Sequence, residues 1–373
     1  MNKKRLTGII AACIIVVAVV VVVAVGRMPT RDARVVFGDP NLEAAVRQMI
    51  HKPEGPVRAG DLEVLTFLWA SGESIADLTG LEYCTGLKRL VLMDNQISDI
   101  SPLAGLTSLT WLHLTNNEIS DISALAGVTG LETLSLSSNR IGDISPLAGL
   151  TGLAKLYLGD NRDISDISPL AGLTNLEELG LSNMDMDDAG LMELVDVFSA
   201  DLTRLTSLDV SGNQISDISP LAGLTSLISL NLGNNQISDV SPLVGLTSML
   251  SLELRNNQIT SISALEGLTG LLNLDLGWNQ IIDIWPLEGL SNLTYLLLMS
   301  NQISDISALT GLTKLEWLDL EANQISDVKP LVDNGELGRG GYVGLRNNPL
   351  SEESISEHIP ALQARNVSVD YQD

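Results

Sequence analysis

The chain has 373 residues, of which 45% are hydrophobic, and a formal net charge of −25 at pH 7. Proteins that bind nucleic acid need basic patches against the phosphates, so this charge argues against a nucleic-acid partner and favours basic or polar ones. Cys13 and Cys84 lie in unlike parts of the chain and do not suggest a disulfide framework.

Residues 1–26 have the features of a membrane anchor or a signal segment. Lys3, Lys4 and Arg5 precede an uncharged run at residues 6–25. As a helix, this run would cross a hydrocarbon core of about 30 Å. Positive charge before the span predicts a cytoplasmic N-terminus and extracytoplasmic repeats in a single-pass membrane protein. The alternative is a secreted protein, cleaved near Gly26.

A linker and a helical N-terminal cap are expected to follow. Residues 27–36 are mostly polar and predict a linker, whereas residues 37–61 predict the cap. Asp39 can cap a helix that begins at Pro40. Its apolar face would comprise Leu42, Val46, Met49 and Ile50. We expect this face to cover the open core of the first repeat.

Residues 62–350 are built from a repeat of 22 residues. In residues 106–127, apolar residues recur with a single asparagine, Asn117, between Leu114 and Ile119, and the pattern returns in residues 128–149. The spacing L-x-x-L-x-L-x-x-N is typical of a leucine-rich-repeat solenoid. One coil cannot bury its own apolar face, so neighbouring coils must stack on it.

Two polar residues recur once per coil. The aligned asparagines predict a ladder of amide hydrogen bonds to buried backbone groups; they are Asn95, Asn117, Asn139, Asn161, Asn213, Asn235, Asn257, Asn279, Asn301 and Asn323. An aspartate row is interpreted as turn caps, with a calcium array as the alternative; it comprises Asp99, Asp121, Asp143, Asp166, Asp217, Asp239, Asp283, Asp305 and Asp327.

Two segments depart from this repeat. The coil at residues 173–201 is longer, and its stripe of Leu191, Leu194, Val195 and Phe198 predicts a helix. That helix would be a wedge that changes the curvature or, alternatively, a docking site for a partner. Residues 351–373 predict a C-terminal cap, in which a helix that turns Ile355, Ile359 and Leu362 inward precedes a strand.

The chain resembles bacterial internalin-like leucine-rich-repeat proteins from about residue 37 to residue 371. The matching features are the 22-residue coils ending in Ile-Ser-Asp-Ile-Ser-Pro-Leu and the helix that begins at Asp39 and Pro40. The resemblance implies an α/β fold, a curved right-handed solenoid with a parallel β-sheet on its concave side. It also implies a protein-binding role at the cell surface. The fold by itself does not identify the ligand.

Candidate ligand-binding residues lie on the strands that this pattern predicts. Residues beside the inward leucines face the concave side, and several of them are aromatic although aromatic residues form only 3% of the chain. Exposed Trp and Tyr are typical of protein interfaces, and cross-strand pairs that stabilise the sheet are the alternative. The candidates are Trp69, Trp111, His113 and Tyr157 as an N-terminal cluster, Trp278, Tyr295 and Trp317 as a C-terminal cluster, and Asp209, Glu253, Asp275 and Asp319 as an acidic stretch between them.

The favoured function is therefore that of a surface-displayed protein that binds a protein ligand on its concave face. We expect a monomeric ectodomain, no catalytic residues, no metal and no cofactor, because the three histidines lie in different parts of the chain. An intracellular scaffold, similar to the eukaryotic phosphatase-regulating leucine-rich-repeat protein, and a polysaccharide-binding surface protein are the alternatives.

Overall fold

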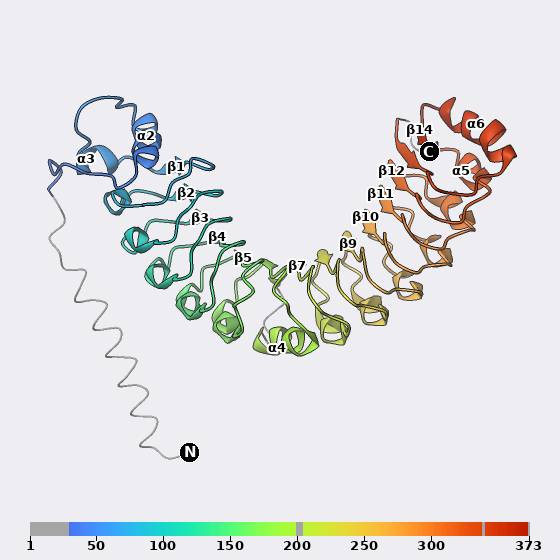
Figure 1. Ribbon diagram of the computed structural model, residues 1–373. Coiled ribbons are helices and arrows are strands. Elements are labelled where there is room, and N and C mark those ends of the chain that lie inside the picture. The colour runs from blue at the N-terminus through green and yellow to red at the C-terminus, as the bar shows by residue number, and fades with distance from the viewer. Residues whose placement is uncertain (1–29, 199–203, 338–339, 372–373) are drawn as a thin grey trace, which may run out of the picture.

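The computed structural model of the protein is an arc of stacked coils (Figure 1) and describes residues 30–198, 204–337 and 340–371. One sheet of 14 parallel strands lies along the inner side of the arc, with its strands in chain order. Short helical turns lie along the outer side. The predicted solenoid with a parallel sheet is confirmed.

Each strand has three residues, and its central residue is buried in the core in every strand except the last, where Val369 is partly buried. Because side chains alternate along a strand, the first and third residues point away from the core, toward the concave side. The strands are β1 (Phe67–Trp69), β2 (Arg89–Val91), β3 (Trp111–His113), β4 (Thr133–Ser135), β5 (Lys155–Tyr157), β6 (Glu178–Gly180), β7 (Ser207–Asp209), β8 (Ser229–Asn231), β9 (Ser251–Glu253), β10 (Asn273–Asp275), β11 (Tyr295–Leu297), β12 (Trp317–Asp319), β13 (Tyr342–Gly344) and β14 (Ser368–Asp370).

Helix α2 (Pro40–Met49) covers the N-terminal end of the core. The Asp39 carboxylate accepts hydrogen bonds from the backbone N–H groups of Asn41 (2.8 Å) and Ala76 (2.9 Å). Asp39 therefore caps the helix, as expected, and also ties it to the first coil. Leu42 and Val46 are fully buried on the apolar face of the helix. The short helix α3 (Ala59–Leu62) leads into the first coil.

The described part of the expected linker packs against this cap. Arg34 forms an isolated antiparallel bridge with Arg58. Val35 is 5% exposed, and its backbone N–H donates to the Val57 carbonyl at 2.9 Å. Residues 30–36 thus contribute to the packing at the N-terminal end of the solenoid.

Helix α4 (Asp188–Phe198) lies on the outer side of the arc, in the long coil (Figure 1). Leu191 and Leu194 are buried, as the stripe of apolar residues predicts. The Asp188 carboxylate accepts hydrogen bonds from the backbone N–H groups of Ser216 (2.6 Å) and Asp217 (2.9 Å) in the next coil. The extra residues of the long coil therefore lie outside the sheet, and Asp188 hydrogen-bonds them to the next coil.

The C-terminal cap contains α5 (Lys329–Asp333), one turn of π-helix at Ser354–His358 and α6 (Ile359–Gln363). Ile359 and Leu362 are buried, but the expectation that Ile355 points inward is wrong, because its side chain is 44% exposed. Ser354 is buried instead. Its hydroxyl donates to the Ser326 carbonyl (2.8 Å) and accepts from the Val328 N–H (3.1 Å).

The asparagine ladder is present as predicted. The Asn235 amide donates to the carbonyls of Leu232 in its own coil (3.0 Å) and Val210 in the preceding coil (3.1 Å). Its oxygen accepts from the Ile215 N–H at 3.1 Å. The same carbonyl bonds recur at every predicted position and continue at Asn348. From residue 84 onward, each coil except the long one, where Met184 takes the asparagine position, is thus hydrogen-bonded to the one before it through an asparagine side chain.

The aspartate row caps the turns that follow. The Asp239 carboxylate, for example, accepts from the Ser241 backbone N–H at 2.8 Å, and the other members bond in the same way. No group of three or more His, Cys, Asp or Glu residues in the described ranges is arranged to hold a metal ion.

Within residues 30–198, 204–337 and 340–371, no helix has the length and apolar character needed to cross a membrane. The predicted N-terminal anchor, residues 1–26, lies outside these described residues.

Replacing one rung of the ladder tests its contribution to stability. We expect Asn235→Leu to lower the free energy of unfolding by about 3 kcal/mol, because the buried Ile215 N–H and two carbonyls lose a partner. The control is Gln236→Leu, the same kind of change at the exposed neighbouring residue. Denaturant unfolding measures both. Equal effects would show that the ladder is not the cause.

Candidate binding surface

The concave face carries two rows of outward side chains. The parallel strands pair in register, so that Tyr295 lies opposite Trp317, and Leu297 opposite Asp319. The first residues of all strands therefore form one continuous row, the first-position row, and the third residues form the third-position row. Every candidate from the sequence lies in one of these two rows except Trp278, which follows β10.

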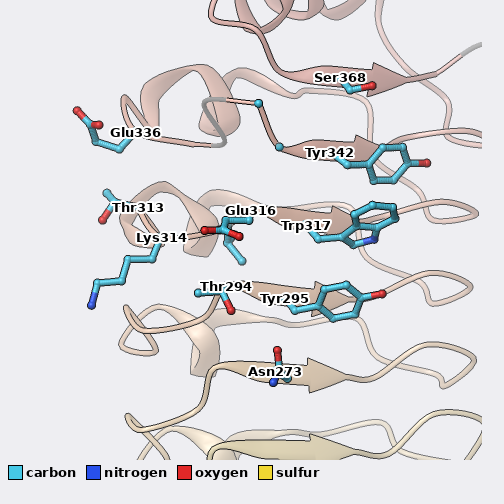
Figure 2. Close-up of a pocket in the computed structure, with 13 residues that line it drawn as sticks. Asn273, Thr294, Tyr295, Thr313, Lys314, Glu316, Trp317, Glu336, Tyr342 and Ser368 are labelled. Carbon is cyan, nitrogen blue, oxygen red and sulfur yellow. The ribbon is translucent and has the colours of Figure 1, made fainter.

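Three rings of the first-position row form an aromatic stack, defined here as Tyr295, Trp317 and Tyr342. The Trp317 ring lies 5.9 Å from the Tyr295 ring and 4.3 Å from the Tyr342 ring, measured between centroids, at interplanar angles of 21° and 27°. Figure 2 shows the three rings side by side across β11, β12 and β13. Trp317 lies between two rings and remains 41% exposed, so this stack stabilises the sheet and still presents aromatic surface to a ligand.

Tyr342 was not among the residues predicted from the sequence. The glycine-rich stretch before it interrupts the 22-residue count, so the last coil could not be aligned by spacing. Val343 is buried, and the residue directly before an inward strand residue is an outward one. That alternation was the signal that could have identified Tyr342.

A hollow of about 1180 Å³ lies beside the aromatic stack, where the chain enters β11, β12 and β13. Its walls include all three rings together with Lys314, Glu316 and other polar residues of the incoming loops (Figure 2). A concave, partly apolar site with a few charged groups suits the side chains of a protein ligand.

Trp278 has an unusual backbone conformation for its type. Its φ of 52° lies in the left-handed region, which is unfavourable for bulky side chains. Asn or Asp occupies most equivalent turn positions, as at Asn234 and Asn256. The Arg255 guanidinium lies 4.0 Å from the centroid of the Trp278 ring, and the side chain remains 41% exposed. The framework does not require a tryptophan at this position.

The N-terminal aromatics do not form the expected cluster. Trp69, His113 and Tyr157 occupy the third-position row on every second strand, about 10 Å apart. Trp111 lies in the first-position row, with the Arg89 guanidinium 4.7 Å from its ring centroid. Trp69 is 63% exposed, more than any other of these four side chains.

His113 and Tyr157 are held by hydrogen bonds on the sheet surface. His113 Nε2 lies 3.0 Å from the Thr115 hydroxyl, which in turn lies 2.7 Å from the Ser135 hydroxyl. Burial lowers the pKa of His113. The Tyr157 hydroxyl donates to Glu178 at 2.5 Å, and burial together with this carboxylate raises the pKa of Tyr157. Both side chains therefore contribute neutral polar surface at pH 7.

The acidic residues of the third-position row do form a row on the concave face, as expected, but they have a second role. One carboxylate oxygen of Asp209, Asp275 and Asp319 accepts a backbone hydrogen bond at 2.9 Å from the residue two positions further on. These aspartates therefore also cap the turn after their strand. Asp370 continues the row and pairs with Arg346 at 2.7 Å; it was not predicted.

The carboxylates of this row disfavour one another's ionisation. Burial, followed by repulsion from Asp275 and Asp209, raises the pKa of Glu253. Burial is also the largest cause of the raised pKa values of Asp275 and Asp319. For Asp275, the nearby Arg255 and the bond from the Gly277 N–H act in the opposite direction. The row is thus an electrostatically unfavourable surface that a cation would stabilise.

We expect Glu253→Gln to stabilise the fold at pH 7 by about 0.5 kcal/mol, as is typical when cross-strand like charges are removed. Because the folded state raises the pKa of Glu253, wild type loses stability relative to this variant as the pH rises from 4 to 7. Asp239→Asn is the matched control. Its stability difference from wild type should change with pH in the opposite direction, because hydrogen bonds from Ser241 lower the pKa of Asp239. Thermal unfolding across this pH range measures both. A stability difference between Glu253→Gln and wild type that does not vary with pH would contradict the repulsion.

Comparison with protein-family models matches the leucine-rich repeats (2 copies) model to residues 107–149, 203–245 and 291–332. No curated protein sequence gives a significant match. Among solved structures, a Toll-like receptor 13 in complex with ssRNA13 shares the fold, with 20% sequence identity, a TM-score of 0.54, and coverage of 84% of this chain and 55% of the receptor. The fold class therefore does not exclude nucleic acid, and the prediction against such a ligand rests on charge alone.

Two internalins of Listeria monocytogenes are more similar in sequence. Internalin InlF is 38% identical, and the match covers 90% of this chain and 91% of InlF with a TM-score of 0.66. Internalin C2 is 35% identical over 66% of this chain and 97% of its own, with a TM-score of 0.50. The resemblance seen in the sequence is confirmed: the chain belongs to the internalin-like family of leucine-rich-repeat proteins.

Proposed function

We propose that this protein is displayed at the cell surface and binds a protein ligand through its concave face. The observation that carries the proposal is Trp278, an exposed aromatic side chain. The left-handed conformation of this turn costs free energy for a tryptophan, and the equivalent turns show that the repeat does not require a tryptophan there. Trp69, in the third-position row of the concave face, is a second exposed aromatic side chain. Leucine-rich-repeat proteins related to internalins are typically non-enzymatic binding scaffolds, which supports a binding role.

The aromatic stack favours a protein over a polysaccharide. Sugar rings pack against free faces of aromatic side chains, whereas Trp317 has a neighbouring ring on either side, Tyr295 and Tyr342. The stack instead offers ring edges, hydroxyl groups and an adjoining hollow that also contains Lys314 and Glu316. Rigid aromatic groups with polar neighbours are characteristic of protein interfaces.

The proposal also includes a membrane location. Residues 1–26 join three basic residues to an uncharged run of spanning length, so we assign them as an anchor with a cytoplasmic N-terminus. The repeats would then be extracytoplasmic. Secretion after cleavage near Gly26 preserves the same binding function, whereas an intracellular scaffold would not use this segment.

Tryptophan substitutions test the binding face. We expect Trp278→Asn and Trp69→Ala each to weaken binding to extracellular protein extracts at least fivefold. The fold should remain intact, because relief of strain at residue 278 opposes the loss of about 0.5–1 kcal/mol from the Arg255 contact. The control is Trp285→Ala, since Trp285 is 51% exposed but belongs to a helical turn of the outer side.

Surface plasmon resonance with the immobilised full chain compares these variants with wild type. Protease treatment of the extract should abolish the signal, and periodate treatment should not. Normal binding by both concave variants would contradict the proposed face, and the reverse sensitivity to protease and periodate would indicate a polysaccharide.

Protease accessibility tests the topology. On intact cells that express the full chain, we expect added protease to remove the repeats while residues 1–26 stay in the membrane fraction, because the basic residues hold the N-terminus inside. Lysed cells are the control for cleavage. Repeats that resist cleavage until lysis would contradict surface display.

A further inference from the structure

We propose that the concave face over β8, β9 and β10 binds a cationic amphipathic helix of the partner protein. This inference rests on the proposed function and specifies the chemistry of its ligand. It comes from three parallel rows of side chains that coincide in these coils.

The first of these rows is apolar and lies directly before the strands. Ile228, Leu250 and Leu272 are 40%, 40% and 38% exposed. Their backbones are hydrogen-bonded in register, with the Leu250 N–H donating to the Ile228 carbonyl (2.8 Å) and the Leu272 N–H to the Leu250 carbonyl (2.9 Å). The residues at this position in the other coils are Thr66, Lys88, Thr110, Glu132, Ala154, Glu177, Thr206, Thr294, Glu316, Gly341 and Val367, of which Val367 is a single apolar residue that is only 4% exposed. A run of large apolar residues therefore occurs here and not elsewhere along this position.

The second row consists of small polar residues. Ser229, Ser251 and Asn273 occupy the first-position row on β8, β9 and β10. On β11 and β12 the same row carries the bulky rings of Tyr295 and Trp317. The short side chains allow a partner backbone to approach the sheet in these three coils.

The third row is acidic and lies on the far side of the small residues. It contains Glu253 on β9 and Asp275 on β10, with the neutral Asn231 at this position on β8 and Asp209 on the neighbouring strand β7. Repulsion from Asp275 and Asp209 acts on Glu253. Arg255 faces Asp275, but its guanidinium also stacks on Trp278. Lysine or arginine side chains of a partner would relieve this repulsion, and the N-terminal half of the same row lacks carboxylates.

The dimensions fit a helix. The apolar and acidic rows are three strand residues apart, about 10 Å, which matches the diameter of an α-helix. Three strands span about 10 Å, or about two helical turns. A helix along the rows would place leucine-like side chains on Ile228, Leu250 and Leu272 and basic ones on the acidic row, an arrangement known from helix-in-groove recognition.

A model peptide tests this chemistry directly. The probe is an 18-residue peptide of leucine and lysine with helical amphipathic spacing, and its control is a scrambled peptide of the same composition. Fluorescence anisotropy is measured with the full chain in phosphatidylcholine nanodiscs, after subtraction of empty nanodiscs. We expect the amphipathic peptide to bind at least tenfold more tightly than the scrambled one. Equal affinities would reduce the effect to general charge attraction and overturn the inference.

Matched variants locate the site. Leu250→Ser and Glu253→Gln should each weaken peptide binding at least fivefold. Val244→Ser removes an apolar side chain that is 61% exposed on the outer side, and Glu132→Gln removes the same charge as Glu253→Gln at an exposed position beside β4. Both controls should change the affinity less than twofold. Equal losses in variants and controls would overturn the inference.

These outcomes separate the inference from the function on which it rests. Suppose that Trp278→Asn abolishes binding of extracellular protein while the chain binds the amphipathic and scrambled peptides equally. The concave face then binds a partner of other chemistry, and only the assignment of a cationic helix as the ligand is wrong. If the tryptophan variants also bind normally, both proposals fail.

Discussion

A buried asparagine side chain in each regular coil joins that coil to the one before it, and the solenoid depends on this contact. The strands are only three residues long, so the chain leaves the sheet with backbone groups that a single coil cannot pair. The amide supplies two donors and an acceptor at this point. Departures from 22 residues are tolerated where the contact survives: Asn213, after the long coil, still bonds to the Leu181 and Val210 carbonyls.

This framework separates the residues that hold the fold from those available to a ligand. Leucines, isoleucines, asparagines and capping aspartates occupy fixed positions in most coils, whereas the outward strand positions vary from tryptophan to serine. The inward set accounts for the stack of coils, and variation on the concave face changes the binding surface at little structural cost. The third-position aspartates combine both roles, because one oxygen caps a turn and the other remains available.

The concave face is not arranged for maximal stability. Trp278 occupies a left-handed turn position that suits asparagine, and Asp209, Glu253 and Asp275 carry like charges on one surface. Local choices that oppose stability are expected where a surface is arranged for binding. Both departures lie between β7 and the turn that follows β10, the stretch that also carries the apolar row formed by Ile228, Leu250 and Leu272.

The repeat period alone determined the solenoid, the inward residues, the asparagine ladder and the two outward rows, because these follow from a spacing that recurs in every coil. Tertiary structure decided which side chains meet. Trp69, His113 and Tyr157 are separated because they lie on every second strand. Tyr342 stacks on Trp317, although the glycine-rich stretch before it prevents its alignment with the repeat by spacing. Ile355 points outward because Ser354 takes the buried position at the cap. Such contacts depend on the stacking of coils and on irregular turns, which spacing along one chain does not encode.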